Sequence, residues 1–449
     1  MKNPTRLVAP DNRPTLPFAS VPRQSPCVAK SVGARMTSSF EKDVRIGSAS
    51  SDAMEVLLDF GALMIRAGNT ATRTREWIEA IARKMDFDRI SITLSLDSIT
   101  ASAHRLGARF TAMREIGLPG INVWRIAELE QLAKAPGSTP GEIAARLEEI
   151  ESAKPLYSTV QLAAAVGVAS GAFAFLNGAA APDMIAAAIG GGIGQWSRAL
   201  LSRRHLNQYG IAALSAIAAS GIYVLAAALA QRVGFEFRNY PAGFIASVLF
   251  LIPGFPLIAA LFDLLQYQTV AAVSRFAYGA MILLAVALGL SIVIAIGGVD
   301  ITRQPPLELA YPFRLLLRAI ASFVAGATFA MLFNTPARAV LVAGFLALVA
   351  NNLRLILNDM GMMLAPSAFF AALLIGLVAL ALNERSNIPR LAMTVAPTVI
   401  MIPGVYVFEM IVLFNRGQML DALQASAVCG FAIGALAMGL ATARFFIRR

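Results

Sequence analysis

The sequence predicts an all-α polytopic membrane protein, with about ten transmembrane helices in two inverted five-helix repeats and a small cytoplasmic α+β domain at the N-terminus. Three observations support this fold class. Of the 449 residues, 57% are hydrophobic and 14% charged, which lies outside the soluble globular range. Apolar runs of about twenty residues, each long enough to cross a ~30 Å hydrocarbon core, recur from residue 159 onward. Related segments also return in the same order along the chain.

The net charge of +11 is explained by membrane topology. Basic residues lie in the N-terminal tail and in short loops between apolar runs, which is the distribution that the positive-inside rule describes. We therefore expect a lipid bilayer, and no nucleic acid, as the partner of these charges. Two cysteines and two histidines offer no disulfide framework and no metal site. We expect no cofactor and no metal.

The N-terminal part divides into a tail and a folded domain. Residues 1–50 are rich in Pro, Ser and Arg and are predicted to be disordered. Residues 51–157 are predicted to form the cytoplasmic α+β domain: two helices, three strands (ISITLSLD, ITASAHR and ARFTAMREI) and two further helices. Before the last of these helices, Thr139 and Glu142 have the spacing of a capping box.

The membrane part is predicted to contain two halves, residues 158–300 and 301–449. Arginines in alternate loops and at the C-terminus place both termini in the cytoplasm. We expect a multi-pass protein of the inner (plasma) membrane. The predicted spans are residues 159–178, 183–202, 208–230, 241–265, 270–297, 314–334, 337–358, 363–383, 389–414 and 419–445.

Three pairs of segments indicate the repeat. GAFAFLN resembles GATFAMLFN, GQWSRALL resembles ANNLRLIL, and LFLIPGFPLIAALFDLL resembles VAPTVIMIPGVYVFEMIVLF. Each pair is displaced by about 150 to 160 residues, in the same order. Because each copy holds an odd number of spans, the second copy must enter the membrane upside down, which is a common plan in secondary transporters.

Two Ile-Pro-Gly segments interrupt long apolar helices near mid-membrane. Pro253 and Pro403 lack an amide hydrogen and are expected to free the carbonyls of Leu249 and Val399. Gly254 and Gly404 follow them and let the backbone approach a ligand. Since unsatisfied backbone is tolerated at this depth only where it is buried or lines a wet cavity, we predict that both breaks bind substrate. The alternative is a pair of packing kinks.

Two acids within the spans are candidates for proton coupling. Glu409 lies six residues beyond Pro403 and is the first choice for a proton-carrying group. Asp263 lies near the cytoplasmic end of its span. It either takes part in coupling or only pairs with Arg275 or solvent.

Four further polar residues within the predicted spans are candidates for binding substrate. Arg198 and Arg354 occupy matching positions in the two halves and could attract a carboxylate, or could snorkel to the membrane surface. Asn351 and Asn352 could offer amide groups to substrate, or could hold helices together. We include all four among the substrate-binding candidates.

The chain resembles the threonine/serine exporter family over about residues 54–446. The resemblance is carried by LLDFGALMIRAGNTATRTREWI, LIPGFPLIAALFDLL, NTPARAVLVAGFLALVANNLRLIL and MIPGVYVFEMIVLFNRG. It implies a cytoplasmic N-terminal domain, ten spans in two halves and export driven by the proton motive force. In some relatives the halves are separate chains linked to export of dicarboxylates such as succinate. Ile258, Ala259 and Ala260 replace small polar residues of the family, and QYQT replaces a glycine after Asp263.

These observations predict a secondary active exporter of small polar metabolites of the threonine and serine type, coupled to protons. The alternatives are a dicarboxylate exporter, a passive pore, and a membrane-anchored hydrolase that uses Asp97 and His104 of the N-terminal domain. No nucleophile elbow surrounds any serine, and we assign no catalytic residue. Homo-oligomerisation is compatible with the sequence.

Overall fold

The computed structural model describes residues 50–105, 107–117, 119–136, 139–204, 206–235, 240–297, 309–385 and 388–446. The predicted disordered tail lies almost wholly outside these residues. The chain forms two units, residues 1–52 and 53–449. Of the first unit only residues 50–52 are described, and they are helical. The second unit contains every element discussed below.

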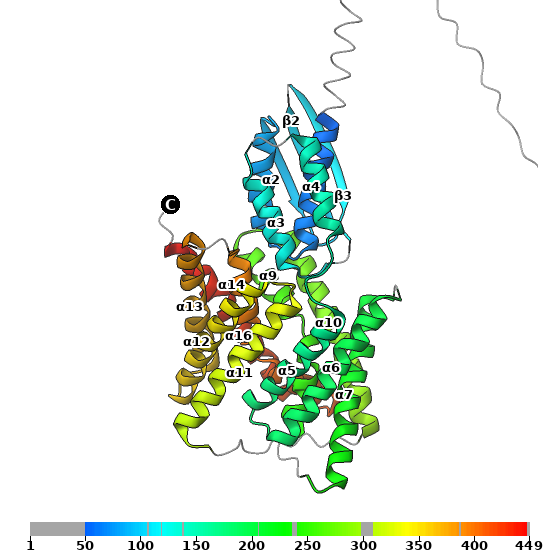
Figure 1. Cartoon of the computed structure of the whole chain (residues 1–449), viewed down its shortest axis with the longest axis vertical. Helices are drawn as coiled ribbons and strands as arrows, with labels where there is room; N and C mark the ends of the chain where they lie inside the picture. The colour runs from blue at the N-terminus through cyan, green and yellow to red at the C-terminus, as the bar shows by residue number, and fades with distance from the viewer. Residues whose placement is uncertain are drawn as a thin grey trace, which may run out of the picture. The chain divides into compact units, whose positions relative to one another are not determined.

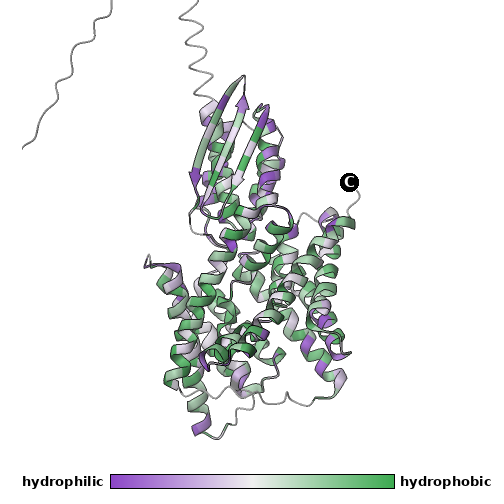
Figure 2. Cartoon of the chain, turned by 180° about the vertical axis from the view of Figure 1, so that it is seen from behind, coloured by the Kyte–Doolittle hydropathy of each residue, from purple (hydrophilic) through white to green (hydrophobic). Residues whose placement is uncertain are grey.

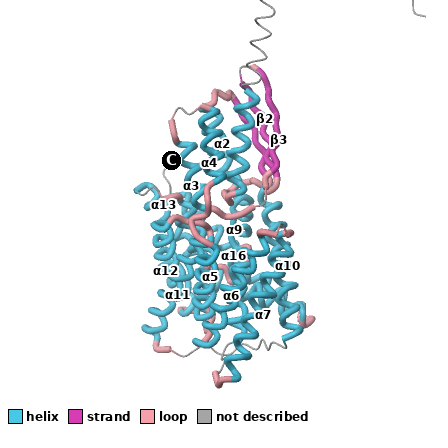
Figure 3. Tube along the Cα trace, turned by 45° about the vertical axis from the view of Figure 1, so that its right-hand side comes forward, coloured by secondary structure: helices cyan, strands magenta, loops and turns pink. Residues whose placement is uncertain are grey.

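The N-terminal part of this second unit has the predicted order of elements. A helix over residues 53–66 is followed by α2 (Ala71–Lys84), three strands and two more helices. Figure 3 shows the helices packed on one face of the sheet. The remaining elements are β1 (Arg89–Leu94), β2 (Ser98–Arg105), β3 (Ala108–Glu115), α3 (Val123–Lys134) and α4 (Pro140–Ser152).

The sheet is antiparallel, in the order β1-β2-β3. Ile99, Ala101 and Ala103 are buried at alternate positions of β2, because successive side chains point to opposite faces of a strand. They belong to an apolar core that this part builds with its own helices. The predicted capping box is confirmed, since the Thr139 side chain accepts from the Glu142 amide and the Glu142 side chain accepts from the Thr139 amide.

The rest of the unit is a bundle of apolar helices, visible as the largely green region of Figure 2. Among the described residues, seven helices are long and apolar enough to cross a membrane, and two bent helix pairs raise the number to nine. The remaining predicted span, residues 183–202, is also a helix but is not among these nine. The helices are α5 (Thr159–Leu176), α6 (Ala181–Ser202), α7 (Gln208–Arg232), α8 (Tyr240–Val248), α9 (Gly254–Leu265), α10 (Thr269–Gly297), α11 (Tyr311–Leu332), α12 (Ala337–Asp359), α13 (Leu364–Arg385), α14 (Arg390–Val399), α15 (Gly404–Asn415) and α16 (Met419–Ala443).

The bounds of these helices correspond between the two halves. α6 and α12 begin 156 residues apart, as do α7 and α13, while α9 and α15 begin 150 residues apart. The turns that follow α5 and α11 show that one pair of segments was aligned incorrectly in the sequence comparison. Gly178 (φ 87°) and Asn334 (φ 55°) are the equivalent left-handed residues, so Asn177 corresponds to Phe333 and not to Asn334. The comparison by residue type was one position out because both segments end in asparagine.

The halves meet in the middle of the bundle. α5 packs against α11 as well as against α6, and the three lie side by side in Figure 1. The rings of Phe173 and Phe329, which are equivalent residues, make an edge-to-face contact with centroids 5.5 Å apart. Such pairs stabilise an apolar contact by about 0.5–1.5 kcal/mol beyond area burial. This contact joins α5 to α11 beside the two helix breaks.

Candidate functional site

The two Ile-Pro-Gly breaks have the same backbone geometry. Pro253 has φ −78° and ψ 54°, and Pro403 has φ −78° and ψ 70°. In each break the glycine amide donates to the carbonyl two residues earlier, from Gly254 to Ile252 and from Gly404 to Ile402, both at 2.8 Å. These are inverse γ-turns centred on proline. The helix axes bend by 61° at the first break and by 43° at the second.

The two carbonyls that the prolines were expected to free are hydrogen-bonded in the structure. Leu249 O accepts from the Ile252 amide at 3.2 Å, and Val399 O accepts from the Ile402 amide at 3.1 Å. Both carbonyls are therefore satisfied, because the chain tightens to a three-residue turn before each proline, in the first case as a short 3₁₀ segment. In the second break, the carbonyl that accepts a side chain is that of Met401.

The two breaks pack directly against each other. A Cβ atom added to Gly254 would lie 2.3 Å from Cδ1 of Ile402, and one added to Gly404 would lie 2.3 Å from Cδ2 of Leu249 and 3.2 Å from Cδ1 of Ile252. Each glycine therefore leaves room for side chains of the other half to pack against its Cα. Glycine is required here for close approach, and the exchange of contacts is reciprocal.

We predict that Gly254→Ala destabilises this contact and that a second change in the other half relieves it. The added methyl overlaps the end of Ile402, and overpacking of this kind costs about 1–3 kcal/mol. The double variant Gly254→Ala/Ile402→Ala should recover most of the loss in a thermal unfolding assay. Gly430→Ala, which has no heavy atom within 4 Å of the added Cβ, is the control. Additive losses in the double variant would contradict the reciprocal contact.

A cavity lies beside each break. The cavity at Pro253 has a volume of about 240 Å³ and is lined by Arg198, Arg275 and Tyr278, together with loop residues of the N-terminal part. The cavity at Pro403 has a volume of about 210 Å³ and is lined by Arg354 and Tyr406, among others. Among the described residues, neither lining contains an aspartate or glutamate. Both cavities therefore favour an anionic group.

The arginine of the second half is held in place. Arg354 donates from Nη1 to the carbonyl of Met401 at 3.1 Å and from Nε to Oδ1 of Asn351 at 3.0 Å. Asn351 in turn donates to Oγ of Ser322 at 2.8 Å. Asn351 thus orients the arginine from behind and is not among the cavity-lining residues. Asn352 is buried on the same helix, and its Oδ1 has no hydrogen-bond partner among the described residues.

The arginine of the first half is in a different state. The side chain of Arg198 is exposed and makes no hydrogen bond or ion pair within the described part of the chain. Gln195, the equivalent of Asn351, is 7% exposed, and its Oε1 has no hydrogen-bond partner there. Sequence reasoning missed Gln195, although the displacement that pairs Arg198 with Arg354 also pairs Gln195 with Asn351.

Asp263 lies in a buried ion pair that joins the bundle to the N-terminal part. Its Oδ2 is 3.0 Å from Nε of Arg275, and its Oδ1 accepts from the amide of Ala71 at 2.9 Å. Arg275 donates to the carbonyl of Asn69. Ala71 is the first residue of α2, so the carboxylate caps that helix, where negative charge is favourable. This is the pairing alternative that the sequence left open for Asp263.

Glu409, the other acid, occupies a different position. It lies on α15, five residues beyond Gly404, and is partly buried. It does not line either of the cavities at the breaks. Its proposed role in proton coupling therefore requires movement of α15 or a path other than these two cavities.

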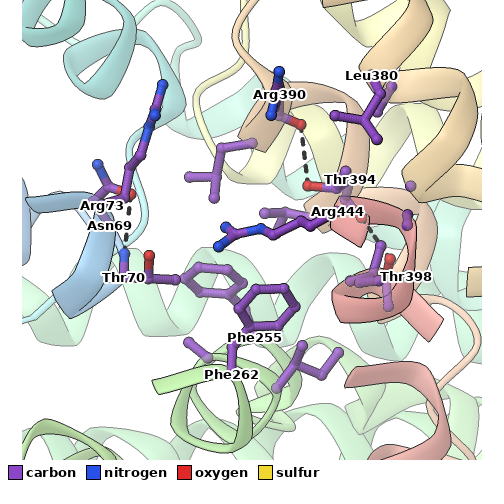
Figure 4. A pocket seen from close by; sticks show the side chains of 18 of the residues that line it. Asn69, Thr70, Arg73, Phe255, Phe262, Leu380, Arg390, Thr394, Thr398 and Arg444 are labelled. Carbon is purple, nitrogen blue, oxygen red and sulfur yellow. Dashed lines mark hydrogen bonds between the residues drawn. The ribbon is translucent and has the colours of Figure 1, made fainter. Parts of the chain in front are cut away.

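A third cavity, of about 260 Å³, lies where α2 and α3 meet the ends of α9, α13, α14 and α16. Figure 4 shows the side chain of Arg444 extending into its middle, close to two phenylalanine rings. No residue of its polar rim had been singled out from the sequence. Its lining residues come from six separate segments of the chain, and no local sequence pattern joins them. The charged and aromatic lining residues are Arg73, Glu76, Glu130, Phe255, Phe262, Arg390 and Arg444.

The two residues that the hydrolase alternative would use, Asp97 and His104, lie far apart. Asp97 lies in the turn before β2 and accepts a hydrogen bond from the Ser95 hydroxyl. His104 lies near the other end of the same strand, roughly 23 Å away at strand rise. The two residues therefore do not form a catalytic pair. No group of three or more His, Cys, Asp or Glu residues that could hold a metal occurs within the described ranges.

Comparison with known proteins agrees with this architecture. The chain is 25% identical over 240 residues to "Probable succinate transporter subunit YjjP" of Escherichia coli, covering 53% of this chain and 92% of that protein. The protein of the same name from Klebsiella aerogenes is 23% identical over 242 residues, covering 52% and 90%. No solved structure matches the chain. Two models of the threonine/serine exporter ThrE match residues 55–297 and 318–446. The chain therefore belongs to the threonine/serine exporter family.

Proposed function

We propose that the protein is a secondary active exporter that binds a small carboxylate-bearing metabolite at the paired helix breaks. The observation that carries this proposal is the reciprocal packing of the two breaks, with an arginine-lined cavity beside each one. Broken helices near mid-membrane, on related halves of opposite orientation, are the usual substrate site of secondary transporters. The corresponding helix bounds support an inverted repeat in this chain.

The lining of the cavities favours a dicarboxylate over threonine or serine. Arg198 and Arg354 supply cationic donors, one in each cavity, and no acid lines either cavity among the described residues. A carboxylate pairs strongly with a guanidinium, often through two hydrogen bonds. The ammonium group of an amino acid would find only carbonyl and hydroxyl oxygens. A succinate-like molecule matches two arginines better, and the E. coli relative is described as a succinate transporter subunit.

The different states of the two arginines suggest how the site alternates. In this structure Arg354 donates hydrogen bonds to Met401 and Asn351, while Arg198 makes no such hydrogen bonds within the described residues. In an inverted repeat, the two halves exchange conformations when the protein changes access. In the opposite state Arg198 would therefore contact Gln195 and the carbonyl of Leu251, the equivalent of Met401, and Arg354 would be released to the substrate.

We further propose that Glu409 carries the coupled proton. An ionisable group within a broken membrane helix is expensive to keep and is a functional candidate by default. The charges of the loops support an inner-membrane location with both termini, and hence the N-terminal domain, in the cytoplasm.

Transport by the purified full-length protein in vesicles tests this function. We expect labelled succinate to accumulate above equilibrium when a pH gradient is imposed, and labelled threonine to accumulate at least about tenfold less. Glu409→Gln should abolish accumulation but retain exchange of internal for external succinate, because exchange needs no net proton movement. Accumulation of threonine alone would favour the amino-acid exporter. Uptake of either solute that never exceeds equilibrium would contradict active transport.

A further inference from the structure

The third cavity differs from the cavities at the breaks in both charge and wall chemistry. Its rim is formed by residues of α2, α3 and α14 and by Arg444, which directly follows α16, and it contains three guanidinium groups and two carboxylates. Its walls are apolar side chains of the membrane helices. They include Phe255, Ile258, Phe262, Leu380, Leu391, Val395 and Leu440.

Both carboxylates of the rim are engaged by one arginine. Nη1 of Arg73 is 2.9 Å from Oε2 of Glu76, and its Nε is 3.4 Å from Oε1 of Glu130. Glu130 also accepts from the indole of Trp77 at 3.2 Å. The acids are therefore directed toward Arg73 and its neighbour on α2, and neither of them forms an ion pair with Arg444 in the described part of the chain.

Arg444 extends into the cavity. Its guanidinium lies over the ring of Phe262, 4.8 Å from the centroid, and its side chain makes no hydrogen bond or ion pair within the part of the chain that the structure describes. The ring fixes the position of the charge without neutralising it. All five donors of the guanidinium remain available to a ligand. Figure 4 shows this group in the middle of the cavity.

We propose that this cavity binds an amphiphilic oxyanion, a molecule with one anionic head and a compact apolar body. The head would lie at Arg444 and Arg390, and the body between the phenylalanine rings of α9 and the aliphatic side chains of α13, α14 and α16. Basic pockets between the ends of membrane helices are typical sites for anionic heads. The ligand is either a free organic acid or an anionic lipid of the bilayer, since both present this chemistry.

The position of the cavity gives such a ligand a regulatory role. Its lining combines residues of α2 and α3 with residues of both halves of the bundle, α9 in the first and α13, α14 and α16 in the second. A bound ligand would hold these elements together on the side of the breaks that lies nearest the N-terminal domain. Thr398 lines this cavity and Val399 lines both cavities at the breaks, so occupancy would oppose movement of α14.

Calorimetric titration of the full-length protein in phosphatidylcholine nanodiscs tests the site. Hexanoate is expected to bind, with acetate and hexylammonium binding at least about tenfold more weakly, because one lacks the apolar body and the other has the wrong charge. Arg444→Gln should weaken hexanoate binding at least about tenfold. Arg385→Gln removes the same charge from the end of α13, outside the lining, and should leave binding within about twofold.

Further arms separate the ligand sources and the transport site. If phosphatidylglycerol in the nanodiscs suppresses hexanoate binding and raises the melting temperature of the wild type but not of Arg444→Gln, the ligand is a lipid. If phosphatidylglycerol has no effect on hexanoate binding, it is a free acid. Equal binding of hexanoate and hexylammonium, equal loss in both arginine variants, or displacement of hexanoate by succinate would overturn the proposal. None of these results depends on whether the protein transports succinate.

Discussion

Replacing Arg198 by glutamine is expected to reduce succinate transport by about ten- to a hundredfold. The substitution keeps hydrogen-bonding capacity but removes the charge from the cavity at Pro253. Hydrogen bonds to charged groups contribute about 1.5–3 kcal/mol, and each 1.4 kcal/mol corresponds to a factor of ten. Initial rates of uptake in vesicles measure the effect. Arg204→Gln removes the same charge from an exposed turn and should retain transport.

A comparison among three variants distinguishes substrate binding from positioning. Arg354→Gln should also reduce transport, since it removes both the hydrogen bond to the carbonyl of Met401 and the second cation. Gln195→Met leaves both arginines in place and removes only the buried side-chain amide. We expect it to slow transport severalfold while equilibrium succinate binding changes by less than about twofold. Unchanged transport in Gln195→Met would contradict the exchange of arginine contacts between the two states.

Removing the charge of Asp263 is expected to destabilise the protein by about 3–5 kcal/mol. The substitution Asp263→Asn leaves Arg275 buried without its partner, and an uncompensated buried charge has a cost of this size. It also weakens the cap on α2. The purified variant should have a lower melting temperature. Its N-terminal part should also be cleaved faster by a protease, which gel electrophoresis of the digested protein measures.

A matched control and a rescue test the cause of this loss. Asp59→Asn breaks another aspartate–arginine pair of the same unit, between Asp59 and Arg114 at 2.9 Å. Both side chains of that pair are exposed, so the cost should be at most about 1 kcal/mol. Asp263→Leu/Arg275→Met replaces both charges by apolar groups and should recover much of the lost stability. A double variant as unstable as Asp263→Asn would contradict the ion pair as the cause.

The sequence alone determined the classes and order of the elements. Periodicity located the N-terminal helices and strands, because one buried face leaves a repeat of 3.6 or 2 residues in the chain. The capping box at Thr139 depended only on residues three apart. The Ile-Pro-Gly breaks were also predictable, since the missing amide and the ring of proline act on the local backbone. These features are encoded by neighbours in the sequence.

The tertiary structure decided what these elements touch. Gly254 packs against Ile402, Arg354 donates to the carbonyl of Met401, and Asp263 caps α2. No local sequence pattern predicts these partners, because they are distant in the chain. Which carbonyl accepts a side chain depended on how tightly each turn closed, and so the expectation for Leu249 and Val399 was wrong. The third cavity is assembled from segments hundreds of residues apart. Contacts of this kind depend on how helices pack, and packing is a property of the whole chain.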